Sequence, residues 1–178
     1  HLRSSSLGTN GYSIAMKIRS EQPGDEVAIA SVTKRAFALA EHSDGTEADI
    51  VERLRSADAL SVSLVAVEGN DIVGYVAFSP VAIDGRDRGW FGLGPVPVLP
   101  ARQRAGIGAQ LVEQGLARLR RMNAKGCVVL GEPGYYGRFG FKADPRLTYP
   151  GPPPEYFQAL PFGEGLLSDN VPSHPAFG

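Results

Sequence analysis

The pattern of apolar and polar residues along the chain predicts alternating strands and helices in its first half. In two stretches, apolar residues recur every three or four positions, as in a helix with one buried face, and Asp25 is expected to cap the first of them. Two apolar runs flank the turn sequence Gly69-Asn70-Asp71 and indicate a β-hairpin, and a polar loop is expected at 84–88. In chain order, the expected elements are a strand at 17–19, helices at 26–39 and 47–54, and strands at 61–68, 72–78 and 90–93.

The second half of the chain predicts a strand–helix–strand unit. A short strand at 95–98 leads through a basic loop into a helix that begins near Ile107. Gly115 lies on the apolar stripe of that helix and is expected to let it approach the sheet closely. A buried strand at 127–130 completes the unit, and the last main strand is expected at 156–160, after a proline-rich linker.

Composition fits one soluble domain of ordinary size. The chain has 178 residues and a net charge of -1, with 43% hydrophobic and 21% charged residues. We expect a single domain at 16–178, preceded at 1–15 by a tag or flexible tail, because the first residues are rich in Ser, Gly and Asn. The near-neutral charge argues against a nucleic-acid partner, and the lack of a run of about 18 apolar residues argues against a membrane span. The cytoplasm is the default expectation.

The single cysteine, Cys127, excludes an internal disulfide and a multi-cysteine metal site. It lies in the apolar run at 127–130, so a buried, unreactive thiol is favoured over a catalytic nucleophile. No metal is expected.

The loop before the third helix carries the first candidate chemistry. Gly106 and Gly108 lack side chains, so a ligand can approach the backbone closely, while Arg102 and Arg104 add positive charge. A helix start also leaves backbone N–H groups without intrahelical partners and carries the positive end of the helix dipole. The loop therefore predicts a cradle for a pyrophosphate. An ordinary strand–turn–helix corner is the alternative.

Two prolines mark the strand before this loop. Pro95 and Pro97 are two residues apart, so in an extended strand their missing N–H groups face the same edge. Such a strand cannot pair continuously along that edge. We expect the sheet to open here, with the backbone groups of Val96 and Val98 free to bind an extended, amide-containing ligand. A simple edge strand would explain the prolines equally well.

These motifs together resemble the GNAT superfamily of acyl-CoA-dependent N-acyltransferases. Residues 103–108, Q-R-A-G-I-G, match its Q/R-x-x-G-x-G/A signature, and residues 96–100 are similar to the strand end that precedes it. Residues 135–141, Y-Y-G-R-F-G-F, resemble its F-Y-x-x-x-G-F element. The resemblance extends over about 17–160. It implies an α+β fold whose mixed central sheet, of about six or seven strands flanked by helices, is splayed between the fourth and fifth strands.

The resemblance also implies acetyl-CoA as the cosubstrate. The backbone of Val96 and Val98 would hold the pantetheine arm and the acetyl carbonyl. Two departures affect the wall of this site: Val129 stands where many members have an Asn that binds pantetheine, and Pro133 with nearby glycines shortens the helix that bears the motif tyrosine. The pyrophosphate would be wrapped by backbone N–H groups of Gln103, Arg104, Ala105, Gly106, Ile107, Gly108 and Ala109.

The family's general-acid position falls on Tyr136. A phenol with a reference pKa of about 10 is protonated at neutral pH and could donate to the leaving sulfur. The backbone N–H of Val96 would meet the oxyanion. Glu132 is the first candidate for the base, and a water chain is an alternative. Other candidate bases are His42, Glu47, Asp84 and Asp87.

The implied function is transfer of an acetyl group from acetyl-CoA to a primary amine by direct attack in a ternary complex. We expect a small-molecule or peptide acceptor, no nucleic-acid or membrane partner, and a monomer or homodimer. A non-catalytic acyl-CoA-binding sensor or regulatory domain is the alternative, since it would keep the same cradle. Dinucleotide binding fits less well, because Gly106-Ile107-Gly108 lacks the third spaced glycine of that motif.

Overall fold

A computed structural model of the chain describes residues 6–7, 13–38, 45–163 and 175–177. The α-helices are α1 (Glu26–Phe37), α2 (Glu47–Ser56), α3 (Ile107–Arg121) and α4 (Pro133–Tyr136). Short 3-10 turns are η1 (Pro100–Arg102), η2 (Gly137–Phe139) and η3 (Pro154–Tyr156). The strands are β1 (Ser6–Leu7), β2 (Ser13–Ile14), β3 (Met16–Ser20), β4 (Val62–Glu68), β5 (Asp71–Ile83), β6 (Arg86–Leu93), β7 (Gly126–Leu130), β8 (Lys142–Ala143), β9 (Phe157–Pro161) and β10 (Pro175–Phe177).

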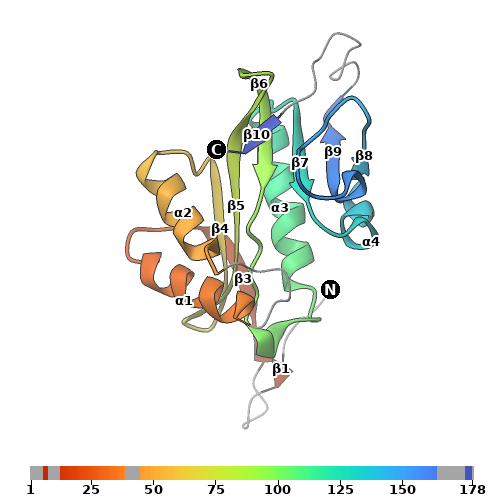
Figure 1. Ribbon diagram of the computed structural model, residues 1–178. Helices are drawn as coiled ribbons and strands as arrows, with labels where there is room; N and C mark the ends of the chain where they lie inside the picture. The colour runs from red at the N-terminus through yellow and green to blue at the C-terminus, as the bar shows by residue number, and fades with distance from the viewer. Residues whose placement is uncertain (1–5, 8–12, 39–44, 164–174, 178) are drawn as a thin grey trace.

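Over the described residues, the main sheet is mixed and has eight strands. Its order is β3-β4-β5-β6-β7-β9-β8, and β10 pairs with β5 outside this path (Figure 1). Each neighbouring pair is antiparallel except β6 and β7, which run parallel and are joined through α3. Strand β6, helix α3 and strand β7 thus form a strand–helix–strand unit, but the short strand expected at 95–98 is wrong. Strand β6 ends at Leu93, and residues 95–98 make only one isolated bridge, Val98 with Gly74, because Pro95 and Pro97 have no N–H to donate. Strands β1 and β2 form a separate two-stranded sheet, and the boundary expected at residue 16 stays a prediction.

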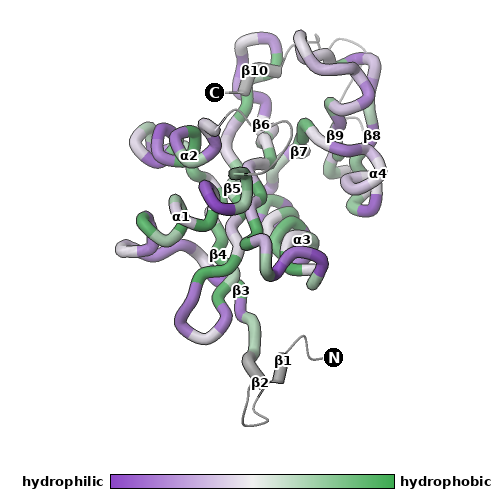
Figure 2. The backbone as a smooth tube through the Cα atoms, turned by 60° about the horizontal axis from the view of Figure 1, so that its bottom comes forward, coloured by the Kyte–Doolittle hydropathy of each residue, from purple (hydrophilic) through white to green (hydrophobic). Residues whose placement is uncertain are grey.

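Helices cover both faces of the central strands. Successive side chains of a strand point to opposite faces, so Leu64 and Phe78 pack toward α3, whereas Val65 and Tyr75 pack toward α1 and α2. Figure 2 shows the hydrophobic residues along β4 and β5, between these two helical layers. The sheet is therefore the middle layer, and its buried strands fix the positions of the loops at its edges.

The β5–β6 hairpin is longer than the polar residues at 84–88 predict. Strand β5 continues to Ile83 and β6 begins at Arg86, so only Asp84 and Gly85, with φ of 55° and 72°, form the turn. Strand β10 pairs with Val81–Ile83, beyond the point where β4 ends its pairing at Phe78. Strand pairing on both edges of this part of β5 outweighs the polarity of the hairpin tip.

The first helix begins at Glu26 as expected, but Asp25 makes no side-chain cap hydrogen bond. Its carboxylate instead accepts hydrogen bonds from Arg19 Nη1, at 2.8 Å, and from the backbone N–H of Gln22. The hydrogen bond from Arg19 is the main cause that lowers the pKa of Asp25. Asp25 therefore ties β3 to the start of α1.

Among the described helices, none is both long and apolar enough to cross a bilayer.

Gly115 allows α3 to pack closely against β5. A Cβ built on Gly115 would lie 2.1 Å from Cε1 and 2.5 Å from Cζ of Phe78, so no side chain fits without movement. We predict that Gly115→Ala destabilises the protein by about 1–3 kcal/mol, because overpacking outweighs the better helix propensity of alanine. The measurement is chemical denaturation. Gln114→Ala, at an exposed position of the same helix, should be nearly neutral; a Gly115→Ala variant as stable as the wild type would contradict the packing account.

Candidate active site

The sheet opens between β6 and β7. These strands pair from Trp90 with Gly126 to Leu93 with Val129, and there the ladder ends. The chain after Leu93 stays on β5 instead, because Tyr75 N donates to Pro97 O at 2.9 Å and Ala77 N donates to Pro95 O at 3.3 Å. Counted from Met16, β6 and β7 are the fourth and fifth strands, so the predicted splay is confirmed.

The proline edge of residues 95–98 faces β5, where the proline carbonyls still accept hydrogen bonds. The backbone groups of Val96 and Val98 alternate to the other edge, toward the opening. Among the described residues, no protein group accepts a hydrogen bond from Val96 N or Val98 N. The Val98 carbonyl is not free as expected, because it accepts a hydrogen bond from Gln103 Nε2 at 3.0 Å. Two backbone donors therefore line the opening.

The loop from η1 to α3 presents the helix start to the same opening. Its sharp course needs φ of 72° at Arg104 and 81° at Gly106. The first intrahelical hydrogen bond runs from Gln110 N to Gly106 O, so the preceding N–H groups of α3 have no intrahelical partner. The Ile107 side chain is buried in the core and anchors the turn. This is the geometry expected for an anion at a helix N-terminus.

The two arginines of the loop are not equivalent. Arg102 Nε donates to Glu68 Oε1 at 2.5 Å, so its charge is largely offset by a carboxylate. Arg104 is exposed and makes no ion pair among the residues that the structure describes. Of the two arginines, only Arg104 therefore adds positive charge that no carboxylate among the described residues offsets. Glu68 is far away in sequence, so no local pattern indicates this pair.

The other wall of the opening is the short helix α4. Hydrogen bonds tie the turn before it to β9 and η3: Gly131 N donates to Tyr156 O at 2.9 Å, and Gln158 Nε2 donates to Gly131 O at 3.0 Å. Gln158 is only 1% exposed. Sequence reasoning missed this residue, and the only available signal was an amide within an apolar strand. The helix has four residues, as Pro133 and its glycine neighbours predict.

Tyr136 packs against the apolar core beside this turn. Its ring makes an edge contact with the ring of Phe141, with centroids 6.0 Å apart, and a Cβ on Gly131 would lie only 2.4 Å from Tyr136 Cε2. Only glycine at position 131 leaves room for the ring. Burial is the main cause that raises the pKa of Tyr136 to about 12, so its phenol is protonated at neutral pH.

Tyr135, to which the sequence analysis gives no role, lies beside the first turn of α3. A Cβ built on Gly108 would lie 3.4 Å from Tyr135 Oη, 3.6 Å from Val98 Cγ2 and 4.0 Å from Val96 Cγ1. The hydroxyl, the first turn of α3 and the segment 95–98 therefore surround one small volume. The signal in the sequence was a second tyrosine where the F-Y-x-x-x-G-F element has Phe.

Of the candidate bases that the structure describes, only Glu132 lies next to the two tyrosines. Glu132 is exposed at the start of α4, next to the two tyrosines, and its carbonyl accepts from the Tyr135 and Tyr136 N–H groups. Asp84 and Asp87 lie at the distal end of the β5–β6 hairpin, several residues before the ladder with β7 ends. Glu47 begins α2, on the opposite face of the sheet from α3. His42 lies outside the described residues.

Two further residues, Cys127 and Val129, are buried in β7. Cys127 is 0% exposed, and burial raises the pKa of its thiol well above the usual value, which fits an unreactive core thiol. Val129 is buried in β7, so the place of the family's Asn is apolar here. Within the described part of the chain, no group of three or more His, Cys, Asp and Glu side chains is arranged to hold a metal ion.

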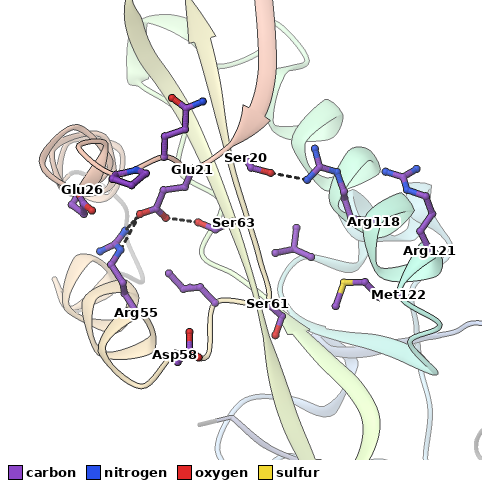
Figure 3. Close-up of a pocket in the computed structure, with 14 residues that line it drawn as sticks. Ser20, Glu21, Glu26, Arg55, Asp58, Ser61, Ser63, Arg118, Arg121 and Met122 are labelled. Atoms are coloured by element: carbon purple, nitrogen blue, oxygen red, sulfur yellow. Dashed lines mark hydrogen bonds and ion pairs between the residues drawn. The ribbon is translucent and has the colours of Figure 1, made fainter.

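A separate cavity of about 590 Å³ lies at the C-terminal end of α3 (Figure 3). Arg118 on its wall donates to Ser20 Oγ at 2.8 Å, and Glu21 pairs with Arg55 at 2.8 Å across it. The loop at Gly106 lies at the other end of α3, about 20 Å away for a helix of this length. The cavity is therefore distinct from the opening between β6 and β7.

A family model described as an acetyltransferase (GNAT) domain matches residues 59–143. N-acetyltransferase YhbS of Escherichia coli K12, itself uncharacterized, is 38% identical over 141 residues, which cover 76% of this chain and 81% of YhbS. The chain belongs to the GNAT family of acetyltransferases. The matched stretch of this GNAT acetyltransferase contains the opening, the loop and both tyrosines.

Solved structures agree with this assignment. A GNAT family acetyltransferase from Brucella melitensis in complex with acetyl-CoA is 48% identical, has a TM-score of 0.80, and is matched over 92% of this chain and 96% of its own. YhbS from Escherichia coli in complex with CoA is 32% identical, has a TM-score of 0.83, and is matched over 94% of this chain and 92% of its own. The GNAT fold of this acetyltransferase is thereby shown.

Gly108 tests whether the volume beside Tyr135 and Val98 belongs to the ligand. An alanine Cβ fits there at ordinary contact distances, whereas the branched side chain of valine would fill the space. We predict that Gly108→Val weakens binding of CoA more than about ten-fold, while the matched variant Gly108→Ala stays within about three-fold of the wild type. Isothermal titration calorimetry with CoA measures both. Equal affinities of the two variants would show that the ligand does not approach Gly108.

Proposed function

We propose that this GNAT acetyltransferase transfers an acetyl group from acetyl-CoA to a primary amine, by direct attack of the amine within a ternary complex. One observation carries the proposal: the unpaired backbone donors of Val96 and Val98 lie in a sheet opening that leads directly to the open helix start at Gly106. An extended molecule with amides at one end and phosphates at the other matches this order of donors. Acetyl-CoA has that chemistry, and the relatives from Brucella melitensis and Escherichia coli were solved with acetyl-CoA and CoA.

Val96 is proposed to stabilise the oxyanion. When the amine nitrogen attacks the thioester carbon, the carbonyl oxygen gains negative charge, and a fixed backbone N–H at this point would donate a hydrogen bond to it. The N–H of Val96 is suited to this role because residues 95–98 pair with β5 on their other edge, through the carbonyls of Pro95 and Pro97, and no described protein group competes for it. Such preorganised donors commonly contribute two to three orders of magnitude in rate.

Tyr136 is proposed as the general acid. Collapse of the tetrahedral intermediate forms the amide and breaks the C–S bond, while the phenol donates its proton to the departing sulfur; water then returns a proton to Tyr136. Because burial raises the pKa of Tyr136 to about 12, the phenol carries its proton at neutral pH. A thiol is more acidic than this phenol, so the hydrogen bond to sulfur contributes most while the C–S bond is breaking.

Glu132 is proposed to accept the proton that the attacking amine loses. Its carboxylate is exposed and lies at the start of the helix that carries Tyr136, so acid and base would reach the reacting atoms from the same wall. An exposed carboxylate can also pass the proton to water. We propose a small-molecule or peptide acceptor and a monomer or homodimer as the functional unit.

Tyr136→Phe tests the acid. The substitution keeps the ring and its packing but removes the hydroxyl, so we predict a fall in kcat of about 100-fold or more with little change in the KM for acetyl-CoA. Because the pKa of Tyr136 is raised to about 12, its phenol stays protonated well above neutral pH. The wild-type kcat at saturating amine should therefore not fall between pH 7 and pH 10. Thiol release during turnover of a panel of primary amines measures both.

The outcomes separate the enzyme from a binding protein. A Tyr136→Phe variant with wild-type kcat across this pH range would refute the acid assignment. A protein that binds acetyl-CoA but acetylates no amine of the panel would favour the non-catalytic sensor instead. Glu132→Gln should lower kcat less than Tyr136→Phe, because water can replace an exposed base.

A further inference from the structure

The two neighbouring tyrosines of α4 have different surroundings. Tyr136 lies against Gly131 and the core ring of Phe141. Tyr135 extends to the first turn of α3, where its hydroxyl lies 3.4 Å from the point that a Cβ on Gly108 would occupy. The two rings pack edge to face, with centroids 4.9 Å apart and planes at 87°, so each restricts the other.

Arg138 fixes the orientation of the Tyr135 ring. Its guanidinium carbon lies 4.4 Å from the ring centroid, and its Nε donates to the Tyr135 carbonyl at 3.1 Å. Phe139 adds a second edge contact at 5.6 Å between centroids. A cation over one face and aromatic edges beside it restrict the ring to one direction, which is toward α3.

The Tyr135 hydroxyl has no hydrogen-bond partner among the residues that the structure describes. It is half-buried, and a phenol in this setting ordinarily bonds to a polar group. Val98 Cγ2 and Val96 Cγ1 lie 3.6 Å and 4.0 Å from the same point beside Gly108, and Glu113 on α3 is close enough for its charge to help raise the pKa of Tyr135, after burial as the main cause. A ligand that lies on Gly108 would therefore be within reach of this hydroxyl.

We infer that Tyr135 is a binding residue for the cosubstrate, and that its hydroxyl donates a hydrogen bond to an amide carbonyl of the pantetheine arm near the pyrophosphate. The inference rests on the proposed function, since it concerns the same acyl-CoA site. It divides the two phenols between two parts of one molecule: Tyr135 holds the arm beside Gly108 and Val98, and Tyr136 serves the sulfur. Val129 supplies no polar group on this wall, so the hydroxyl of Tyr135 provides the polar contact there.

Tyr135→Phe and Tyr136→Phe form a matched pair for the test. Each removes one hydroxyl and keeps the ring, and thermal unfolding of both variants checks that the fold is retained. Loss of one neutral hydrogen bond predicts that Tyr135→Phe weakens CoA binding about three- to ten-fold by calorimetry and raises the KM for acetyl-CoA by the same factor. Its kcat at saturating acetyl-CoA should change less than two-fold. Tyr136→Phe should instead lower kcat and leave the KM for acetyl-CoA nearly unchanged.

A fragment of the cosubstrate locates the contact. Adenosine 3′-phosphate 5′-diphosphate has the phosphates of CoA but no pantetheine, so its affinity should be the same for the wild type and Tyr135→Phe. Arg138→Gln removes the cation over the ring and should therefore weaken the binding of CoA, as Tyr135→Phe does. Equal losses for CoA and the fragment would place the contact on the phosphates and overturn the assignment to pantetheine.

The remaining outcomes distinguish this inference from the proposed function. A wild type that does not bind CoA refutes the proposed function. A wild type that binds CoA, with Tyr135→Phe binding it equally well, refutes only the role of Tyr135. A Tyr135→Phe variant that loses kcat at unchanged KM would instead make Tyr135 the acid.

Discussion

The parting of β6 and β7 after the pair Leu93 and Val129 is the constraint on which the site depends. Backbone donors inside a sheet must find acceptors, and a neighbouring strand is the usual source. Here the prolines keep residues 95–98 on β5 through their carbonyls, while β7 turns away at Gly131 into α4. The donors of Val96 and Val98 are left facing the opening, next to the unfilled helix start at Gly106. Every proposed contact with acetyl-CoA follows from this divergence.

The wall that carries the tyrosines is held by interactions distant in sequence. Gln158 on β9 donates to the Gly131 carbonyl, and the absence of a side chain at Gly131 leaves room for the Tyr136 ring. Strand β9 therefore positions the proposed acid although it contributes no group to the reaction. Gly115 likewise positions the loop before α3 without contributing a group to the site. It lets α3 pack against Phe78 and so sets the distance of the helix start from the sheet.

The local parts of the site could be predicted from the sequence, and the parts made by distant residues could not. The glycines and prolines at 95–108 determine their own backbone shape, so the loop, the opening and the helix that follows were recognisable. The Arg102–Glu68 pair, the Gln158 hydrogen bond and the pairing of β10 with β5 join segments far apart in the chain, where no pattern indicates the partner. Tyr135 was missed because adjacent side chains on a short helix take directions that neighbouring elements decide, here α3 and Arg138.

The most direct test of the account is thermal unfolding with CoA, acetyl-CoA, NADH and ATP in parallel. A ligand at 100 times its Kd adds about 2.7 kcal/mol of stability, which corresponds to roughly 5–10 °C in Tm for a chain of this size. The account predicts such a shift with the two CoA compounds and a much smaller one with NADH and ATP. No shift with CoA, or an equal shift with NADH, would contradict the claim that the opening between β6 and β7 is built for an acyl-CoA.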